Sequence, residues 1–173
     1  MIHDMTRAAT LEDSEAIQAF NIAMALETEG KSLCPETISG GVRALIEDPS
    51  KGFYLVAERK GAIVGSLLVT KEWSDWRNGS FWWIQSVYVS PEYRRQGVYK
   101  ALHFYAAEDA RQKGNVCGLR LYVDKDNTIA QGVYAGLRMR PTHYDMYEID
   151  FDARPTRGPE PAWEPEEEND AAE

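Results

Sequence analysis

Anion-binding chemistry is best supported at residues 94–100, which read Arg94-Arg95-Gln96-Gly97-Val98-Tyr99-Lys100. A run with helical spacing follows this segment, and a helix N-terminus leaves backbone N–H groups without internal acceptors and carries partial positive charge. Positions 94 to 98 hold no Ser, Thr, Asp or Asn to cap those amides. The segment is therefore a candidate phosphate site. The alternative is a turn with a solvated basic face.

The elements that must position this segment are a strand before it and a helix after it. Phe81–Val89 is apolar on both alternating faces, which suits a central strand covered on both sides. From Val98 the apolar residues recur at helical spacing as far as Lys113-Gly114. Periodicity predicts further strands at 6–9, 53–58, 63–70, 119–123 and 144–149, and further helices at 11–27, 35–47 and 127–137. This alternation predicts one α/β domain.

Two motifs in these elements resemble the GNAT N-acetyltransferases. The family's loop reads Arg/Gln-x-x-Gly-x-Gly/Ala, and Arg94 and Gly97 match its first two fixed positions, whereas Tyr99 departs at the third. The second motif is the run Asn127-x-x-Ala130-x-x-Val133-Tyr134, followed by Leu137-Arg138-Met139 where members commonly carry Leu-Gly-Phe. The resemblance covers about residues 5–149. It implies the GNAT fold, with a mixed central sheet of six to seven strands flanked by about four helices.

The resemblance also implies how acetyl-CoA is bound. The backbone of Val87, Tyr88 and Val89 is expected to pair with the pantetheine amides like an added strand, and a backbone N–H of this strand to polarise the thioester carbonyl. Asn127 is expected to contact the cofactor arm. The segment 94–100 is expected to hold the pyrophosphate through Arg94, Arg95, Gln96, Gly97, Val98, Tyr99 and Lys100.

A catalytic role is implied for Tyr134, which aligns with the family's general acid and would assist departure of the CoA thiolate. The alternative interpretation is a core tyrosine, since Tyr134 shares a helix face with Ala130, Val133 and Leu137. The two interpretations are compatible. The attacking nucleophile would be the substrate's own amine, so no Ser or Cys nucleophile is required.

The acceptor side is less defined in the sequence. Gln85 holds the most central polar position of the central strand, and an amide cannot accept the amine's proton. A water chain to an acid is the expected route, and the acids in the loops that would border the acceptor are Glu27, Glu29, Glu72 and Asp75. Each is alternatively a surface acid. Trp73 belongs to a group with Trp76, Trp82 and Trp83 that forms either a substrate wall or core packing.

Composition narrows the classes of function. The net charge of -9 is concentrated in residues 151–173, where eight acids face two arginines, so the chain carries no basic nucleic-acid surface. This acidic, proline-rich tail is expected to be disordered beyond a domain at residues 1–150. The sequence has no apolar run of membrane-spanning length, no signal pattern and no zinc-ligand spacing among its two cysteines and three histidines. We therefore expect a cytoplasmic monomer or homodimer without a metal.

Together these features predict an N-acetyltransferase. It would transfer acetyl from acetyl-CoA to a primary amine of a small molecule, or of a peptide or protein, by direct attack in a ternary complex. The alternative is a non-catalytic acyl-CoA-binding sensor or interaction module on the same fold. A generic nucleotide-phosphate binder fits less well, because no Lys-Ser/Thr pair follows the glycine.

Overall fold

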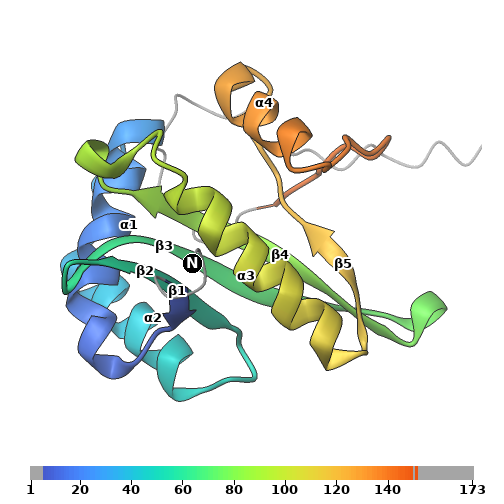
Figure 1. Ribbon diagram of the computed structural model, residues 1–173, viewed down its shortest axis with the longest axis horizontal. Helices are drawn as coiled ribbons and strands as arrows, with labels where there is room; N and C mark the ends of the chain where they lie inside the picture. The colour runs from blue at the N-terminus through green and yellow to red at the C-terminus, as the bar shows by residue number, and fades with distance from the viewer. Residues whose placement is uncertain (1–5, 150, 152–173) are drawn as a thin grey trace, which may run out of the picture. The chain divides into compact units, whose positions relative to one another are not determined.

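The computed structural model describes residues 6–149 and 151. Its strands form one sheet in the order β1-β2-β3-β4-β5, antiparallel except for the parallel β4–β5 pair (Figure 1). The strands are β1 (Thr6–Ala8), β2 (Phe53–Arg59), β3 (Ala62–Ser74), β4 (Gly79–Val89) and β5 (Val116–Arg120). The mixed α/β architecture expected from the sequence is confirmed.

The described residues form four α-helices, as expected. They are α1 (Ser14–Glu29), α2 (Pro35–Glu47), α3 (Val98–Lys113) and α4 (Thr128–Gly136), with short 3-10 turns at Leu11–Asp13, Asp75–Arg77 and Pro91–Tyr93. Local chemistry sets several of these ends. Pro35 begins α2, and Gly30 and Gly114 end α1 and α3 in the left-handed conformation. None of the described helices is long and apolar enough to cross a membrane.

The two faces of the sheet carry separate hydrophobic cores. The buried residues of α3, among them Val98, Leu102 and Ala106, pack on a cluster that contains Leu67, Trp82 and Ile84 of the sheet. The opposite cluster joins Ile17 and Val42 of α1 and α2 to Tyr54, Val56 and Leu68. Helix α3 therefore covers one face, and α1 and α2 cover part of the other.

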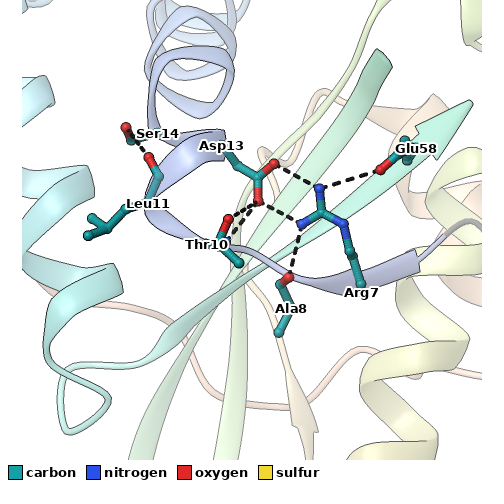
Figure 2. A network of polar contacts seen from close by, with 7 residues as sticks. All are labelled: Arg7, Ala8, Thr10, Leu11, Asp13, Ser14 and Glu58. Atoms are coloured by element: carbon teal, nitrogen blue, oxygen red, sulfur yellow. Dashed lines mark hydrogen bonds and ion pairs between the residues drawn. The ribbon is translucent and has the colours of Figure 1, made fainter. Parts of the chain in front are cut away.

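Asp13 ties the start of α1 to the edge strand β1. Its two carboxylate oxygens accept hydrogen bonds from the Arg7 guanidinium at 2.7 and 2.9 Å, and one of them also accepts from the Thr10 N–H at 2.8 Å (Figure 2). The Asp13 side chain is only 6% exposed. This charge-assisted pairing fixes the angle at which α1 leaves β1.

A bulge in β4 decides which side chains face which helices. Leu68 pairs with Gln85 and Ser66 pairs with Tyr88, so β4 has one residue more than β3 between these pairs, and Ser86 has φ 45°. The extra residue turns Tyr88 toward α1, where its ring lies 5.2 Å from that of Phe20. Val87 and Val89 pack on the α3 side instead.

The predicted strand count and two strand positions need correction. The described residues form five strands rather than six to seven, and no strand is present at 144–149. Alternating apolar residues show what a segment would bury once paired, but they do not supply the partner strand. The expected strand at 119–123 lies instead at Val116–Arg120, because β4 pairs with it only from Ser80 to Trp83. The predicted tail lies outside the described residues except Phe151, so the domain boundary stays a prediction.

Candidate functional site

The segment between β4 and α3 presents a row of backbone N–H groups. Arg95 and Gly97 have φ 60° and 82°, so two residues of this segment are left-handed, and left-handed residues in a turn can direct successive N–H groups to one side. Gly97 is the N-cap of α3 and no side chain caps this end. Within the described part of the chain, the N–H groups of residues 95–100 have no hydrogen-bond acceptor. A phosphate group supplies the acceptors that such a row lacks.

Side chains from other elements hold this segment in place. Arg59, at the end of β2, donates hydrogen bonds to the Gln96 side-chain oxygen at 2.7 Å and to the Gln96 carbonyl at 3.0 Å. Gln96 in turn donates to the Glu92 carbonyl at 2.7 Å. The sequence prediction missed Arg59, because its partner is 37 positions away and the contact depends on strand register. The Gln96 side chain is therefore held by hydrogen bonds within the protein and stabilises the loop conformation.

The basic side chains of the segment have different surroundings. Arg94 donates to the Val89 carbonyl at 2.8 Å and to a Glu27 carboxylate oxygen at 2.7 Å. Lys100 lies over the Phe104 ring, with its ammonium 5.7 Å from the ring centroid. Arg95 makes no side-chain hydrogen bond or ion pair within the described residues, and it is exposed. Arg95 and Lys100 are therefore the cations best able to approach an anion, and Arg94 connects the loop to α1.

Among the described residues, the edge of β4 next to the segment has no strand partner. Pairing with β5 ends at Trp83 and Arg120, so β4 from Ile84 to Val89 has no β5 neighbour. This stretch includes Val87, Tyr88 and Val89, the residues predicted to pair with a pantetheine arm. An extended ligand with amide groups can pair with such an edge as an added strand.

Tyr134 of α4 faces the first turn of α3. Its ring lies 5.9 Å from that of Tyr99, edge-on at 71°. Burial raises the pKa of the Tyr134 phenol. Asn127 begins the same helix, and its side-chain oxygen accepts from the Ala130 N–H at 3.0 Å. Arg138 ends the motif at φ 65°, the left-handed position that glycine normally fills.

On the opposite face, β4 side chains meet the end of α1. The Tyr88 hydroxyl donates to Glu27 at 2.9 Å, and Arg94 bonds the other oxygen of the same carboxylate. Hydrogen bonds from Arg94 and Tyr88 lower the pKa of Glu27, so the side chain is a carboxylate at neutral pH. Gln85 donates to the Thr70 hydroxyl at 2.9 Å on this same face. The structure thus brings Glu27, Tyr88 and Gln85 to one side of β4.

The remaining predicted acceptor residues are arranged differently. Glu72 accepts two hydrogen bonds from Arg120, at 2.7 and 2.9 Å, and a third from the Trp83 indole, and these contacts lower its pKa. Its charge is therefore already paired. Trp73 follows Glu72 in β3 and so points to the opposite, α3-side face, where it is 61% exposed. Glu29 forms an ion pair with Lys31 at 2.6 Å.

No group of three or more His, Cys, Asp or Glu side chains within residues 6–149 is arranged to hold a metal ion. The groups described at the site are backbone amides, phenol groups and carboxylates. Such a set binds phosphate and polarises a carbonyl, and it can stabilise a leaving group by hydrogen bonding.

Comparisons with known proteins agree with this geometry. A model of the acetyltransferase (GNAT) family matches residues 17–137. The solved structure of a possible acetyltransferase from Clostridium difficile 630 is 43% identical, with a TM-score of 0.79, and the match covers 84% of this chain and 95% of that chain. No curated protein sequence gives a significant match.

Two further solved structures share the fold at lower identity. A probable acetyltransferase is 21% identical, with a TM-score of 0.76 over 86% of this chain and 98% of that chain. An integron cassette protein from the mobile metagenome of Cole Harbour Salt Marsh is 17% identical, with a TM-score of 0.78 over 88% and 94% of the two chains. The family match spans both motifs and most of the sheet, and this chain belongs to the GNAT acetyltransferase family.

Proposed function

We propose that this chain is an N-acetyltransferase that moves the acetyl group of acetyl-CoA to a primary amine, by direct attack in a ternary complex. The acceptor is a small molecule, or a peptide or protein amine. The observation that carries the proposal is the row of N–H groups at residues 95–100, which have no acceptor among the described residues. This row lies beside the stretch of β4 that no described strand pairs with, and the Tyr99 ring in it contacts the ring of Tyr134.

In this proposal the backbone of the β4–α3 segment binds acetyl-CoA. The amides of residues 95–100 hold the pyrophosphate, with Arg95 and Lys100 adding positive charge. The backbone of Val87 and Val89 pairs with the pantetheine amides, and the free side-chain N–H₂ of Asn127 contacts the same arm. Arg59 and Gln96 act before binding, because they keep the loop in the conformation that the phosphates require.

The reaction needs the protein to stabilise the carbonyl oxygen, to stabilise the leaving thiolate and to take up the proton of the amine. The amine nitrogen forms a bond to the acetyl carbon, and a backbone N–H at the Ser86 bulge stabilises the negative charge on the carbonyl oxygen. The C–S bond then breaks, and its electron pair stays on sulfur. Tyr134 stabilises that thiolate by donating a hydrogen bond. Complete proton transfer is uphill, since the reference pKa is about 10 for tyrosine and about 8.5 for a Cys-like thiol, and burial raises the pKa of Tyr134 further.

The proton lost by the amine is assigned to a water chain that ends at Glu27. Both oxygens of Glu27 and of Glu72 already accept hydrogen bonds. Glu27 is preferred by position, because its partner Arg94 lies in the loop proposed to bind acetyl-CoA. Glu27 lies beside Tyr88 on the face of β4 that also carries Gln85, and its carboxylate attracts an ammonium substrate. Its lowered pKa makes it a weak base, so its larger contribution is electrostatic.

A non-catalytic acyl-CoA sensor is the second candidate. Tyr99 fills the third loop position, where the family motif has Gly or Ala, and β4 carries an amide at Gln85 rather than a carboxylate. These two departures fit a protein that binds the cofactor without turnover. The Tyr134 phenol beside the loop favours catalysis.

The deciding experiment incubates the protein with acetyl-CoA and a panel of amines while free thiol is followed with a chromogenic reagent. Because Cys34 is exposed, a reaction without acetyl-CoA gives the background. We expect amine-dependent thiol release that is absent in Gly97→Val. Tight CoA binding without release would favour the sensor, and release that does not depend on the amine would indicate hydrolysis only.

A further inference from the structure

Tyr99 is a large residue in a part of the loop where the family motif has a small one. It lies in the first turn of α3, and its ring packs edge-on against that of Tyr134 at 5.9 Å. The Tyr99 hydroxyl is buried and has no hydrogen-bond partner within the described part of the chain. A buried hydroxyl without a partner costs free energy comparable to a lost hydrogen bond. Tyr99 therefore has one unused donor next to the proposed general acid.

The surroundings keep the Tyr99 hydroxyl protonated. Burial and the nearby Tyr134 both raise the pKa of Tyr99, so its hydroxyl stays neutral across the range in which enzymes work. His103 lies one turn further along α3, with its ring 6.0 Å from that of Tyr99, and burial and Arg111 lower its pKa. His103 is thus uncharged at neutral and higher pH.

We infer that Tyr99 is a positioning residue for Tyr134, holding its phenol ring and donating a hydrogen bond to the phenol oxygen as negative charge develops there. This inference rests on the proposed role of Tyr134. When the C–S bond breaks, Tyr134 shares its proton with the sulfur and its own oxygen gains negative charge. Tyr99 keeps its proton and stabilises that charge, so the departing thiolate is stabilised through two phenols in series.

The inference predicts how Tyr134 ionises, independently of turnover. A hydrogen bond donated to a phenolate favours the charged form and lowers its pKa. Protein labelled with 3-fluorotyrosine, whose phenol ionises at lower pH, allows each tyrosine to be titrated by ¹⁹F NMR, and Tyr134→Phe identifies the Tyr134 signal. Tyr99→Phe is expected to raise the Tyr134 midpoint by about one pH unit. An unchanged midpoint would overturn the inference.

The control variant is Tyr54→Phe, which removes another buried hydroxyl from the core on the opposite face of the sheet. It is expected to leave the Tyr134 midpoint unchanged, and a shift as large as that of Tyr99→Phe would overturn the inference by showing a general loss of packing. Circular dichroism confirms that both variants are folded before they are compared.

Enzyme kinetics provide a second test of the inference. Tyr99→Phe is expected to lower kcat about tenfold with little change in the KM for acetyl-CoA, and to have little further effect in a Tyr134→Phe background. Equal effects of Tyr99→Phe in both backgrounds would show that it acts independently of Tyr134. If no amine is acetylated, the proposed function fails, but the NMR titration still decides whether Tyr99 tunes Tyr134.

Discussion

Replacement of Gly97 by valine tests whether the row of amides before α3 is the cofactor site. Gly97 has φ 82°, and a β-carbon built there meets no atom within 4 Å. The substitution therefore causes backbone strain without a clash. Left-handed backbone costs about 1–2 kcal/mol for a residue with a side chain, which corresponds to a fall in Tm of about 2–8 °C. Valine is also expected to move the amides of the loop out of the conformation that binds phosphate.

The matched control is Gly114→Val at the other end of α3. Gly114 has φ 72° and equally open surroundings, so the strain is similar but lies far along the helix from the loop. At a CoA concentration about 100-fold above Kd, a ligand that binds only the native state stabilises it by about 2.7 kcal/mol, which raises Tm by about 5–11 °C.

Differential scanning fluorimetry with and without CoA distinguishes the two variants. Wild type and Gly114→Val are expected to show the CoA-dependent rise in Tm, whereas Gly97→Val is expected to remain folded and to lose it. A full rise in Gly97→Val, or equal loss in both variants, would refute the placement of the pyrophosphate on this loop.

Two further predictions follow from the structure, and a third follows from the sequence of residues 153–173. Tyr134→Phe should lower kcat about 10²-fold with little change in the KM for acetyl-CoA. If steady-state assays give the variant a wild-type kcat, Tyr134 has only a packing role. Asp13→Asn should lower the free energy of unfolding by about 2 kcal/mol at pH 7. Because Arg7 lowers the pKa of Asp13, the stabilisation by this ion pair is present above pH about 4. It is lost as the pH falls through the folded-state pKa of Asp13. Urea unfolding at pH 7 and pH 2 checks this: the difference between wild type and Asp13→Asn should shrink at pH 2, and a constant difference would contradict it. Deletion of residues 153–173 should leave Tm and activity nearly unchanged, since this acidic, proline-rich segment has few core-forming residues, and a large fall in Tm would contradict that expectation.

The sequence predicted the order of helices and strands because each element repeats apolar residues at its own period. Val98 and Leu102 at helical spacing identified α3, and the run Phe81–Val89, with apolar residues on both alternating faces, identified the central strand. The loop proposed to bind phosphate was also identified for a local reason, because Gly97 and the uncapped helix start lie within a few residues of each other. Interactions of this kind depend only on neighbouring residues.

Features set by strand register were not predictable. The bulge at Ser86 uses a residue with no conformational signal for positive φ, and it decides that Tyr88 rather than Val87 faces α1. Arg59 donates hydrogen bonds to Gln96, which lies 37 positions away. Arg120 pairs with Glu72, which lies 48 positions away. Charge alone marked Glu72 as a possible acceptor contact, but its neighbours in space determine that it is already paired.

The central claim is direct transfer of acetyl from CoA to an amine, and the most direct test follows the acetyl group itself. The protein is mixed with acetyl-CoA labelled with ¹³C in the acetyl group and with an amine found active in the thiol-release panel, and products are identified by mass spectrometry at several times in one turnover. The label is expected to pass to the amine in equal amount to the CoA released, with no acetylated protein at any time. Label that accumulates as acetate, or first on a protein side chain, would contradict direct attack in a ternary complex.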